Sequence, residues 1–348
     1  MIRILSIDGG GIRGIVPATI LVSFEAYLKE YSGNRDAKIG DYFDLIAGTS
    51  TGSILTGIYL CPDKLGSINP KYSAQDALDL YMTEGKKIFN QTFLNTIKSG
   101  FGLYGPKYSP KPLEKLLLQY FDDYQLSDMI KPCLIPAYDI GVSEGLFFNQ
   151  IDYLKDDNRN LYVRDVIRGS TAAPTYFPPA NFKGEKGNEF TLIDGGVLAN
   201  NPSLCAYIEA CKYLRCTNSE DVMLLSIGTG TKQADYSYQL TKGWGGAQWS
   251  FGLLNILFSA ASETVDHQLK ILYQGVPWEN QYTRVEVNLK EVGINTALDD
   301  TSDQNMLDLL KLGDSLTKEY EVQLRDFAKQ AVKEQLKRER VKKGNNIK

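Results

Sequence analysis

Residues 42–60 have the sequence YFDLIAGTSTGSILTGIYL, and this stretch decides the fold. Its first six residues are mostly apolar, have the length of a buried strand and end at Gly48. Residues 53–60 are again mostly apolar and stop before Pro62, as expected of a buried helix. The stretch therefore predicts a strand, a glycine-flanked turn and a helix in immediate succession.

The same order of elements recurs on both sides of this stretch. Residues 2–7 predict a strand that runs into glycines, and residues 15–31 have apolar side chains at helical spacing. Further strands are predicted at 132–138, 145–149, 190–193 and 222–227, and further helices at 74–89, 113–120, 163–169 and 203–213. Alternating strands and helices favour a three-layer α/β/α fold with a mainly parallel central sheet. Such a sheet carries its sites at the carboxyl ends of its strands.

The C-terminal part of the chain differs in composition. From residue 303 onward the pattern is helical and highly charged, and residues 333–348 hold seven Lys or Arg and two Glu. We therefore divide the chain into a main domain, residues 1–302, and a charged C-terminal helical tail, residues 303–348. A solvated helix end is the ordinary interpretation of the basic residues, and attraction to anionic lipid is the alternative.

Composition excludes several classes of protein. The 348 residues include 38 Lys or Arg and 42 Asp or Glu, and the net charge of −4 argues against binding to a nucleic-acid polymer. No run is long and apolar enough to predict a signal peptide or a membrane span. Five scattered cysteines without a C-x-x-C pair predict free thiols and a cytoplasmic location. A single histidine, His267, excludes a zinc site of several imidazoles, and no metal-ligand spacing occurs.

Gly48-Thr49-Ser50-Thr51-Gly52 is a G-x-S-x-G motif in its expected setting between a strand and a helix. In such a nucleophile elbow, flanking glycines permit a sharp turn that exposes the serine Oγ. A helix cap by Thr49 or Ser50 is the simpler structural interpretation. The setting favours Ser50 as a nucleophile, with Gly48 and Gly52 in support.

A glycine loop, Gly9-Gly10-Gly11-Ile12-Arg13-Gly14, follows the first strand. Glycines allow close backbone approach, so the loop predicts an anion or oxyanion cradle at the start of the next helix. Its G-x-G-x-x-G spacing also fits a nucleotide-binding module. That alternative expects an acidic residue at the end of the next strand, where the sequence has Ala47-Gly48.

Asp194 is followed by Gly195 and Gly196 and comes directly after a predicted strand. A carboxylate there can face a cleft and act as the base for Ser50. The chain order Ser50, Asp194, His267 also matches a Ser-His-Asp esterase of the α/β-hydrolase type. Against that alternative, only two predicted strands precede Ser50, and His267 falls within an apparent amphipathic helix.

The three glycine-rich motifs together resemble the patatin family of lipid acyl hydrolases. The resemblance runs in order from about residue 4 to residue 207, and includes the STAAP sequence at 170–174 and the NNP sequence at 200–202. The residues after 210 are less similar, although SETVD at 262–266 resembles bacterial members. The main domain is thereby identified as a patatin-like lipid acyl hydrolase domain.

This resemblance implies a mechanism and a substrate class. Ser50 would be the nucleophile and Asp194 the general base of a Ser-Asp dyad, and the backbone of Gly9, Gly10 and Gly11 would form the oxyanion hole. Arg13, Gly14, Gly195 and Gly196 would support the site. The expected reaction is ester hydrolysis of phospholipids or lysophospholipids through an acyl-enzyme, without metal or cofactor. The partner would be membrane or micellar lipid, contacted peripherally at most by a cytoplasmic enzyme, and a small-molecule activator has no recognisable sensor site.

Two features near these motifs have structural and functional interpretations. Arg13 could meet a lipid phosphate, but we favour a structural role in which it pairs with an acid such as Asp8 or Asp44. Residues 243–258 are rich in aromatic and apolar side chains. Their second half predicts a packed helix, and the tryptophans of the glycine-rich first half, Trp244 and Trp249, are the candidates for a lid.

Overall fold

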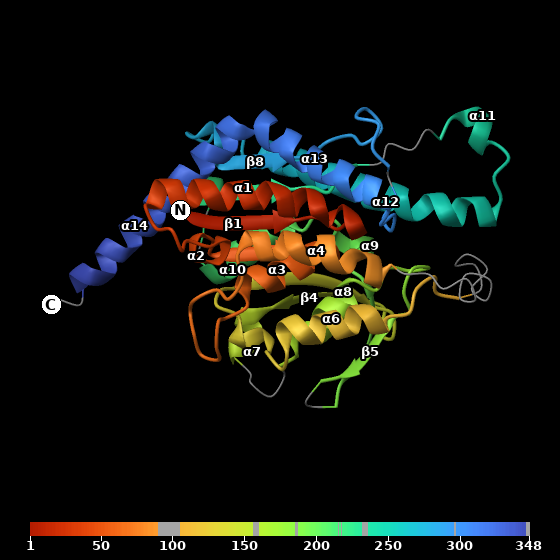
Figure 1. Ribbon diagram of the computed structural model, residues 1–348, viewed down its shortest axis with the longest axis horizontal. Coiled ribbons are helices and arrows are strands. Elements are labelled where there is room, and N and C mark those ends of the chain that lie inside the picture. The colour runs from red at the N-terminus through yellow and green to blue at the C-terminus, as the bar shows by residue number, and fades with distance from the viewer. Residues whose placement is uncertain are drawn as a thin grey trace.

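A central eight-stranded sheet organises the computed structural model (Figure 1). The structure describes residues 1–89, 105–155, 160–184, 187–214, 216, 218–231, 236–295 and 297–345. The strands are β1 (Ile2–Ile7), β2 (Leu45–Gly48), β3 (Cys133–Asp139), β4 (Glu144–Asn149), β5 (Ala180–Lys183), β6 (Glu189–Asp194), β7 (Val222–Ile227) and β8 (Tyr282–Val285). Their order is β5-β6-β3-β2-β1-β7-β8, with β4 paired to β3.

The centre of the sheet is parallel and one edge is antiparallel. Strand β1 pairs in parallel with β2 and β7, and β2–β3 and β7–β8 are parallel as well. Strand β6 runs antiparallel to β3 and β5, and β4 runs antiparallel to β3. The predicted mainly parallel sheet is confirmed. The short strands β5 and β8 were not predicted.

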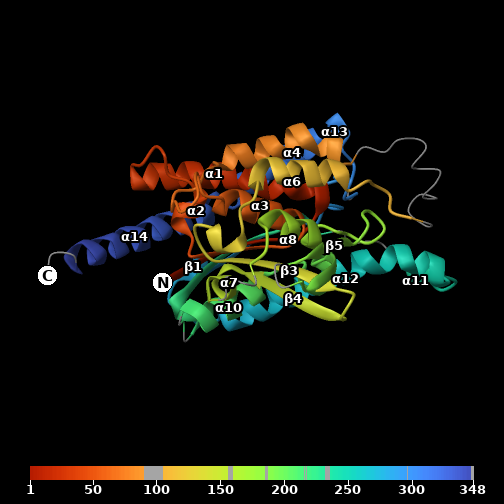
Figure 2. The ribbon, with the colours of Figure 1, turned by 90° about the horizontal axis from the view of Figure 1, so that it is seen from below.

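Helices cover both faces of the sheet, which gives three layers (Figure 2). Along β1, Leu5 and Ile7 point into the larger core, whereas Ile4 points into the smaller one. Apolar residues of α1, α3, α4, α6 and α8 fill the larger core, and those of α10 and α12 fill the smaller one. These helices span Ile15–Ser32, Thr51–Leu60, Ala74–Ile88, Lys111–Phe121, Val163–Ser170, Ser203–Leu214 and Gly246–Leu272. Short helices lie at α2 (Ile39–Tyr42), α7 (Gln150–Lys155), α9 (Gly196–Ala199) and α11 (Tyr238–Thr241).

The charged C-terminal residues form two helices, α13 (Asp303–Glu319) and α14 (Glu321–Asn345). Both helices share the larger core with α1 through Met306, Leu309, Leu312, Leu316, Leu324 and Phe327. Charge holds the second helix as well, because Arg338 of α14 donates to Asp44, which also accepts from the fully buried Arg3. The packing therefore continues across residue 302, where the sequence pattern changes.

The cysteines differ from the free thiols that the sequence predicts. Cys211 and Cys216 form a disulfide, with their Cα atoms 4.4 Å apart, so the expectation of five free thiols is wrong. Helix α10 ends at Leu214, and the chain beyond it brings the second thiol back to the first.

Among the described residues, one helix, Gly11–Ser32, is long and apolar enough to span a membrane, but most of it is buried as a core helix of the fold.

Candidate active site

Ser50 occupies a sharp turn between β2 and α3. Its φ of 53° and ψ of −121° place a non-glycine residue in a strained region of backbone conformation. A Cβ atom on Gly48 would lie 2.0 Å from the carbonyl oxygen of Gly52, and one on Gly52 would lie 2.2 Å from the carbonyl oxygen of Ile7. Only glycine fits on both sides, so the turn has the local geometry of a nucleophile elbow.

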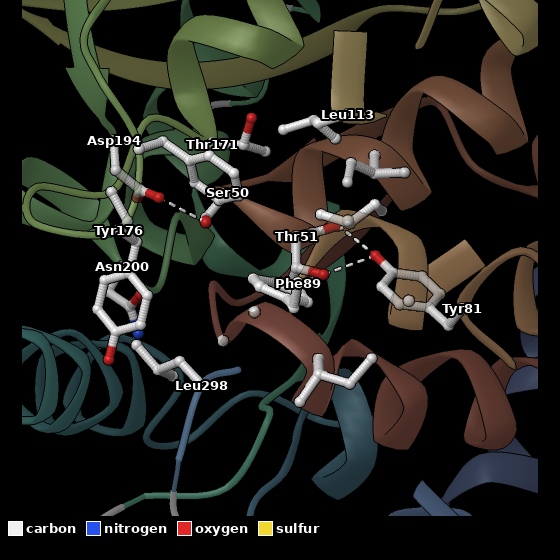
Figure 3. Close-up of a pocket in the computed structure, with 18 of the residues that line it drawn as sticks. Ser50, Thr51, Tyr81, Phe89, Leu113, Thr171, Tyr176, Asp194, Asn200 and Leu298 are labelled. Carbon is white, nitrogen blue, oxygen red and sulfur yellow. Dashed lines mark hydrogen bonds between the residues drawn. The ribbon is translucent and has the colours of Figure 1, made fainter. Parts of the chain in front are cut away.

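Asp194 faces this serine from the end of β6. The Ser50 hydroxyl donates to Oδ2 of Asp194 at 2.6 Å, and the backbone N–H of Gly196 donates to Oδ1 at 2.7 Å (Figure 3). Strand β6 is antiparallel to β3, and its register pairs Asp194 with Ala137. That register brings the carboxylate across β3 to the carboxyl end of β2, next to Ser50.

Burial changes the acidity of Asp194. Its side chain is almost completely buried, and this desolvation raises the pKa of the carboxyl from 3.8 to about 7. The hydrogen bonds from Ser50 and from the Gly196 amide act in the opposite direction, because they stabilise the charged form. The carboxyl group is consequently a proton acceptor matched to neutral pH rather than an ordinary weak base.

Ser170 fixes the turn from behind. Its hydroxyl accepts from the backbone N–H of Ser50 at 3.0 Å and donates to the carbonyl of Pro136 at 2.7 Å. The Gly195 amide donates to the carbonyl of Ser170 at 3.2 Å. Ser170 thus connects the serine turn, strand β3 and the backbone beside Asp194.

The glycine loop passes beside Ser50 as the 3-10 helix Gly11–Gly14, but not all of its amides are free. The Gly9 N–H donates to the carbonyl of Asn200 at 3.1 Å, and the Ile12 N–H donates to that of Leu298 at 2.8 Å. Within the described residues, the amides of Gly10 and Gly11 have no acceptor, and both residues line the pocket that contains Ser50. The expected oxyanion hole included the amide of Gly9. This expectation is corrected, because that N–H already donates to the carbonyl of Asn200.

Arg13 holds the loop in place. Its guanidinium donates from Nη1 to the carbonyl of Gly230 at 3.0 Å and from Nε to that of Gly10 at 3.3 Å. Burial lowers its pKa to about 10, although the nearby Glu286 raises it. The structural role is as expected, but the expected acidic partner is not found.

The acids suggested for Arg13 have other partners. Asp8 accepts two hydrogen bonds from Arg284, at 2.8 and 2.6 Å, and Asp44 binds Arg3 at 2.8 Å. Behind the loop, the hydroxyl of Thr229 donates to the carbonyl of Gly9 at 2.7 Å. Gly14 is also tightly enclosed, because a Cβ there would lie 2.4 Å from the hydroxyl oxygen of Thr51.

An apolar pocket opens at the Ser50–Asp194 pair. It has a cavity volume of about 60 Å³ and lies between the glycine loop and helices α3, α4 and α6. Its apolar lining includes Ile54, Leu80, Ile88 and Phe177. Phe89 and Leu113, which are labelled in Figure 3, belong to the same lining. One reactive hydroxyl, one buried carboxyl and two free amides thus meet at one end of an apolar chamber.

His267 takes no part in this arrangement. It is exposed on α12, it does not line the pocket, and the carboxylate of Asp194 contacts Ser50 directly. This geometry does not support the Ser-His-Asp alternative. The nucleotide-binding alternative would need backbone N–H groups of the glycine loop to bind phosphate. Two of them, those of Gly9 and Ile12, already donate to carbonyl oxygens of the chain.

No group of three or more His, Cys, Asp or Glu suited to a metal ion occurs in the described part of the chain.

The structure agrees only in part with the lid that the sequence predicts within residues 243–258. Neither Trp244 nor Trp249 lines the pocket, whereas Phe258 of the same segment does. Sequence reasoning also missed Thr229 and Leu298, which hold the glycine loop, and Arg284, which holds Asp8 just before it; all three lie more than 200 residues further along the chain. No local spacing marks these residues, because their role arises only when the sheet forms.

Comparisons with known proteins agree with this architecture. Residues 5–206 match the family described as Patatin-like phospholipase. The chain is 34% identical to "Probable inactive patatin-3-Kuras 1" of Solanum tuberosum, covering 94% of this chain and 92% of that protein. It is 33% identical to "Patatin-T5" of Solanum tuberosum, over 94% and 89% of the two chains. It is also 34% identical to "Patatin-like protein 2" of Oryza sativa subsp. indica, over 91% and 84%.

Among solved structures, VipD from Legionella pneumophila aligns with a TM-score of 0.42 at 14% identity. That alignment covers 93% of this chain and 66% of VipD, and the similarity is too low to support any conclusion about function. The sequence matches carry the assignment. They show that the chain belongs to the patatin-like phospholipase family, and this membership supports lipid acyl hydrolase function.

Proposed function

We propose that the protein hydrolyses carboxylic ester bonds of phospholipids or lysophospholipids with a Ser50–Asp194 dyad. The observation that carries the proposal is the 2.6 Å hydrogen bond from the Ser50 hydroxyl to the buried Asp194 carboxylate, at the end of an apolar pocket. The apolar lining fits an acyl chain, whose burial is favourable at roughly 25 cal/mol per Å² of apolar surface. The polar head group would remain at the mouth.

The proposed acylation step uses only groups of this chain. Ser50 Oγ attacks the ester carbonyl carbon while its proton moves to Oδ2 of Asp194. The free amides of Gly10 and Gly11 stabilise the oxyanion of the tetrahedral intermediate. As the intermediate collapses, the C–O bond to the alcohol breaks and Asp194 returns the proton to the leaving oxygen.

Deacylation repeats these roles with water as the nucleophile. Asp194 takes a proton from a water molecule, which attacks the Ser50 ester through a second oxyanion. Collapse releases the fatty acid and returns the proton to Ser50 Oγ. The raised pKa of Asp194, about 7, suits both the acceptance and the return of a proton near neutral pH.

Ser50→Ala and Asp194→Asn test the proposal. Each change should lower kcat for a p-nitrophenyl ester by at least about a thousandfold, and the double variant should be no worse than either single one, because the two residues act as a unit. Asp314→Asn, which removes an exposed carboxylate on α13, is the matched control and should keep wild-type turnover. Losses that multiply in the double variant would give Asp194 a separate role.

The substrate class needs its own assay, since one relative carries the word "inactive" in its name. Wild-type protein and Ser50→Ala should be incubated with a mixture of phospholipids, lysophospholipids and triacylglycerols, and the products identified by mass spectrometry. We expect free fatty acid and deacylated phospholipid with the wild type only. Release from triacylglycerol alone would overturn the phospholipid assignment but not the dyad.

A further inference from the structure

Helix α11 and the first half of α12 extend beyond the body of the molecule (Figures 1 and 2). We call the described residues 236–261 the α11–α12 arm. In both views the arm lies at the opposite end of the molecule from the C-terminal end of α14. Nothing in the proposed chemistry requires such an extension, so it needs a separate explanation.

The arm lacks the charges that exposed helices ordinarily carry. Residues 243–262 read GWGGAQWSFGLLNILFSAAS and contain no Asp, Glu, Lys or Arg. Trp249, Leu253 and Leu257 are spaced four residues apart and therefore share one face of α12. They are 41%, 47% and 46% exposed, and Leu240 of α11 is 56% exposed. Clustered exposed apolar side chains of this kind mark interaction surfaces.

Aromatic packing gives the tip of the arm a defined shape. Trp244 packs edge-on against both Tyr236 and Trp249, with ring centroids 5.2 Å apart in each pair. The Tyr236 hydroxyl donates to the carbonyl of Gly252 at 3.5 Å. The chain around α11 is thereby folded back onto α12, and two of the three tryptophans of the protein lie at this tip.

The same helix leads from the exposed stripe to the reaction site. Phe258, the residue after Leu257, lines the pocket that contains Ser50. Further along α12, the hydroxyl of Ser262 accepts from Nδ2 of Asn200, whose backbone carbonyl holds the glycine loop. One helix therefore carries both the exposed apolar stripe and a residue of the apolar pocket.

We propose that the α11–α12 arm docks on the surface of a lipid bilayer or micelle and delivers the substrate to the pocket. This inference rests on the proposed function, since it takes the substrate to be an aggregated lipid. The stripe carries the tryptophan and leucine side chains with which interfacial helices enter the boundary between head groups and acyl chains. Because residues 243–262 are uncharged, docking depends on apolar contact and needs no anionic lipid.

The basic end of α14 does not serve this surface. It lies at the far end of the molecule from α11 (Figure 1), so it is not part of the surface that the arm presents. Docking by the arm should therefore be insensitive to salt, whereas docking by basic side chains weakens as salt screens the charges. This difference separates the two modes in one assay.

The test is flotation of the full-length Ser50→Ala protein with phosphatidylcholine vesicles, so that no lipid is consumed. We expect binding that changes by less than about twofold between about 0.1 and 0.5 M NaCl. Adding Leu253→Gln and Leu257→Gln should lower the partition coefficient at least about tenfold, since two exposed leucines leave the interface. The matched control, Ile208→Gln with Val322→Gln, alters even more exposed apolar residues on α10 and α14 and should bind as the parent does.

A second assay separates this inference from the proposed function. With Ser50 intact, Leu253→Gln/Leu257→Gln should keep turnover of a soluble monomeric ester within about twofold and lose about tenfold on vesicle phospholipid. If no ester is hydrolysed, the proposed function fails, but flotation of Ser50→Ala still decides the surface. Equal flotation of the arm and control variants would overturn the inference. So would dissociation of a dimer by the arm substitutions without a change in vesicle binding, because a second copy would then cover the stripe.

Discussion

Ser50 and Asp194 belong to elements that lie far apart in the chain, and a single hydrogen bond joins them. The strained backbone of Ser50 persists because neighbours on every side hold it, above all Ser170 and the glycines at 48 and 52. Sequence alone could predict the serine, because its motif is local. It could also place Asp194 after a strand, but not the antiparallel register that brings the carboxylate to the serine.

The oxyanion donors show where residue-level prediction stops. The glycine run indicates free amides, but it does not tell which of them are already bonded. Gly9 lost its expected role because its acceptor, the carbonyl of Asn200, belongs to a distant segment. A prediction of that kind needs the tertiary structure, since the competing acceptor leaves no mark in the loop sequence.

The pH dependence of activity follows from the environment of Asp194. Its pKa of about 7 means that the base is protonated, and therefore inactive, at lower pH. For a soluble ester, kcat/KM should rise with pH up to about 7, level off above it, and be roughly a hundredfold lower at pH 5 than at pH 8. His267→Gln should retain this profile and wild-type turnover. A flat profile, or one that changes in His267→Gln, would contradict the assignment of the base.

At the scale of elements, local patterns predicted most of what the structure contains. The strands and helices with long apolar runs were found near their expected bounds, because their burial depends on their own sequence. Strands β5 and β8 are only four residues long and lie at the two edges of the sheet, so their apolar signal is weak. The docking of α13 and α14 was not predicted, because charged side chains hide the apolar face of each helix.

Asp44 links Arg338 of α14 to Arg3 of β1, and its removal should weaken that contact. Although burial raises its pKa, hydrogen bonds from Arg3 and Arg338 lower it to about 2. Asp44→Asn would leave the buried Arg3 without its charge partner, and should lower the free energy of unfolding by about 3 kcal/mol at pH 7. Denaturant unfolding measures this change, with the exposed Asp36→Asn as control.

The sign of the pH dependence gives a second check on Asp44. A carboxyl with a lowered pKa in the folded state stabilises the protein above its ordinary pKa of 3.8, and loses this effect as the pH falls toward 2. The difference between wild type and Asp44→Asn should therefore shrink below about pH 4. If the difference in unfolding free energy between the two proteins is constant from pH 3 to pH 7, then packing rather than charge holds α14.

For the whole molecule, the proposed site has a cost in stability. The fold buries Asp194 where its pKa is raised, so ionisation of that carboxyl is easier in the unfolded chain than in the folded one. Stability from this group is fully present below the unfolded pKa of 3.8 and is lost as the pH rises through about 7. The pH range in which the base is active is thus the range in which it destabilises the fold.

Asp194→Asn should consequently be more stable than the wild type at neutral and alkaline pH. The gain should be on the order of 4 kcal/mol at pH 8 and should vanish toward pH 4, as the shift of about three pKa units requires. Calorimetric unfolding across this range measures the difference in Tm. Ser50→Ala is the control, because it is equally inactive but keeps the carboxyl group. Its stability should still fall as the pH rises, over a range moved to higher pH because the hydrogen bond from Ser50 to the ionised carboxyl is lost. If the gain of Asp194→Asn does not depend on pH, then relief of packing rather than of buried charge is its cause, and the carboxyl is not poised as a base.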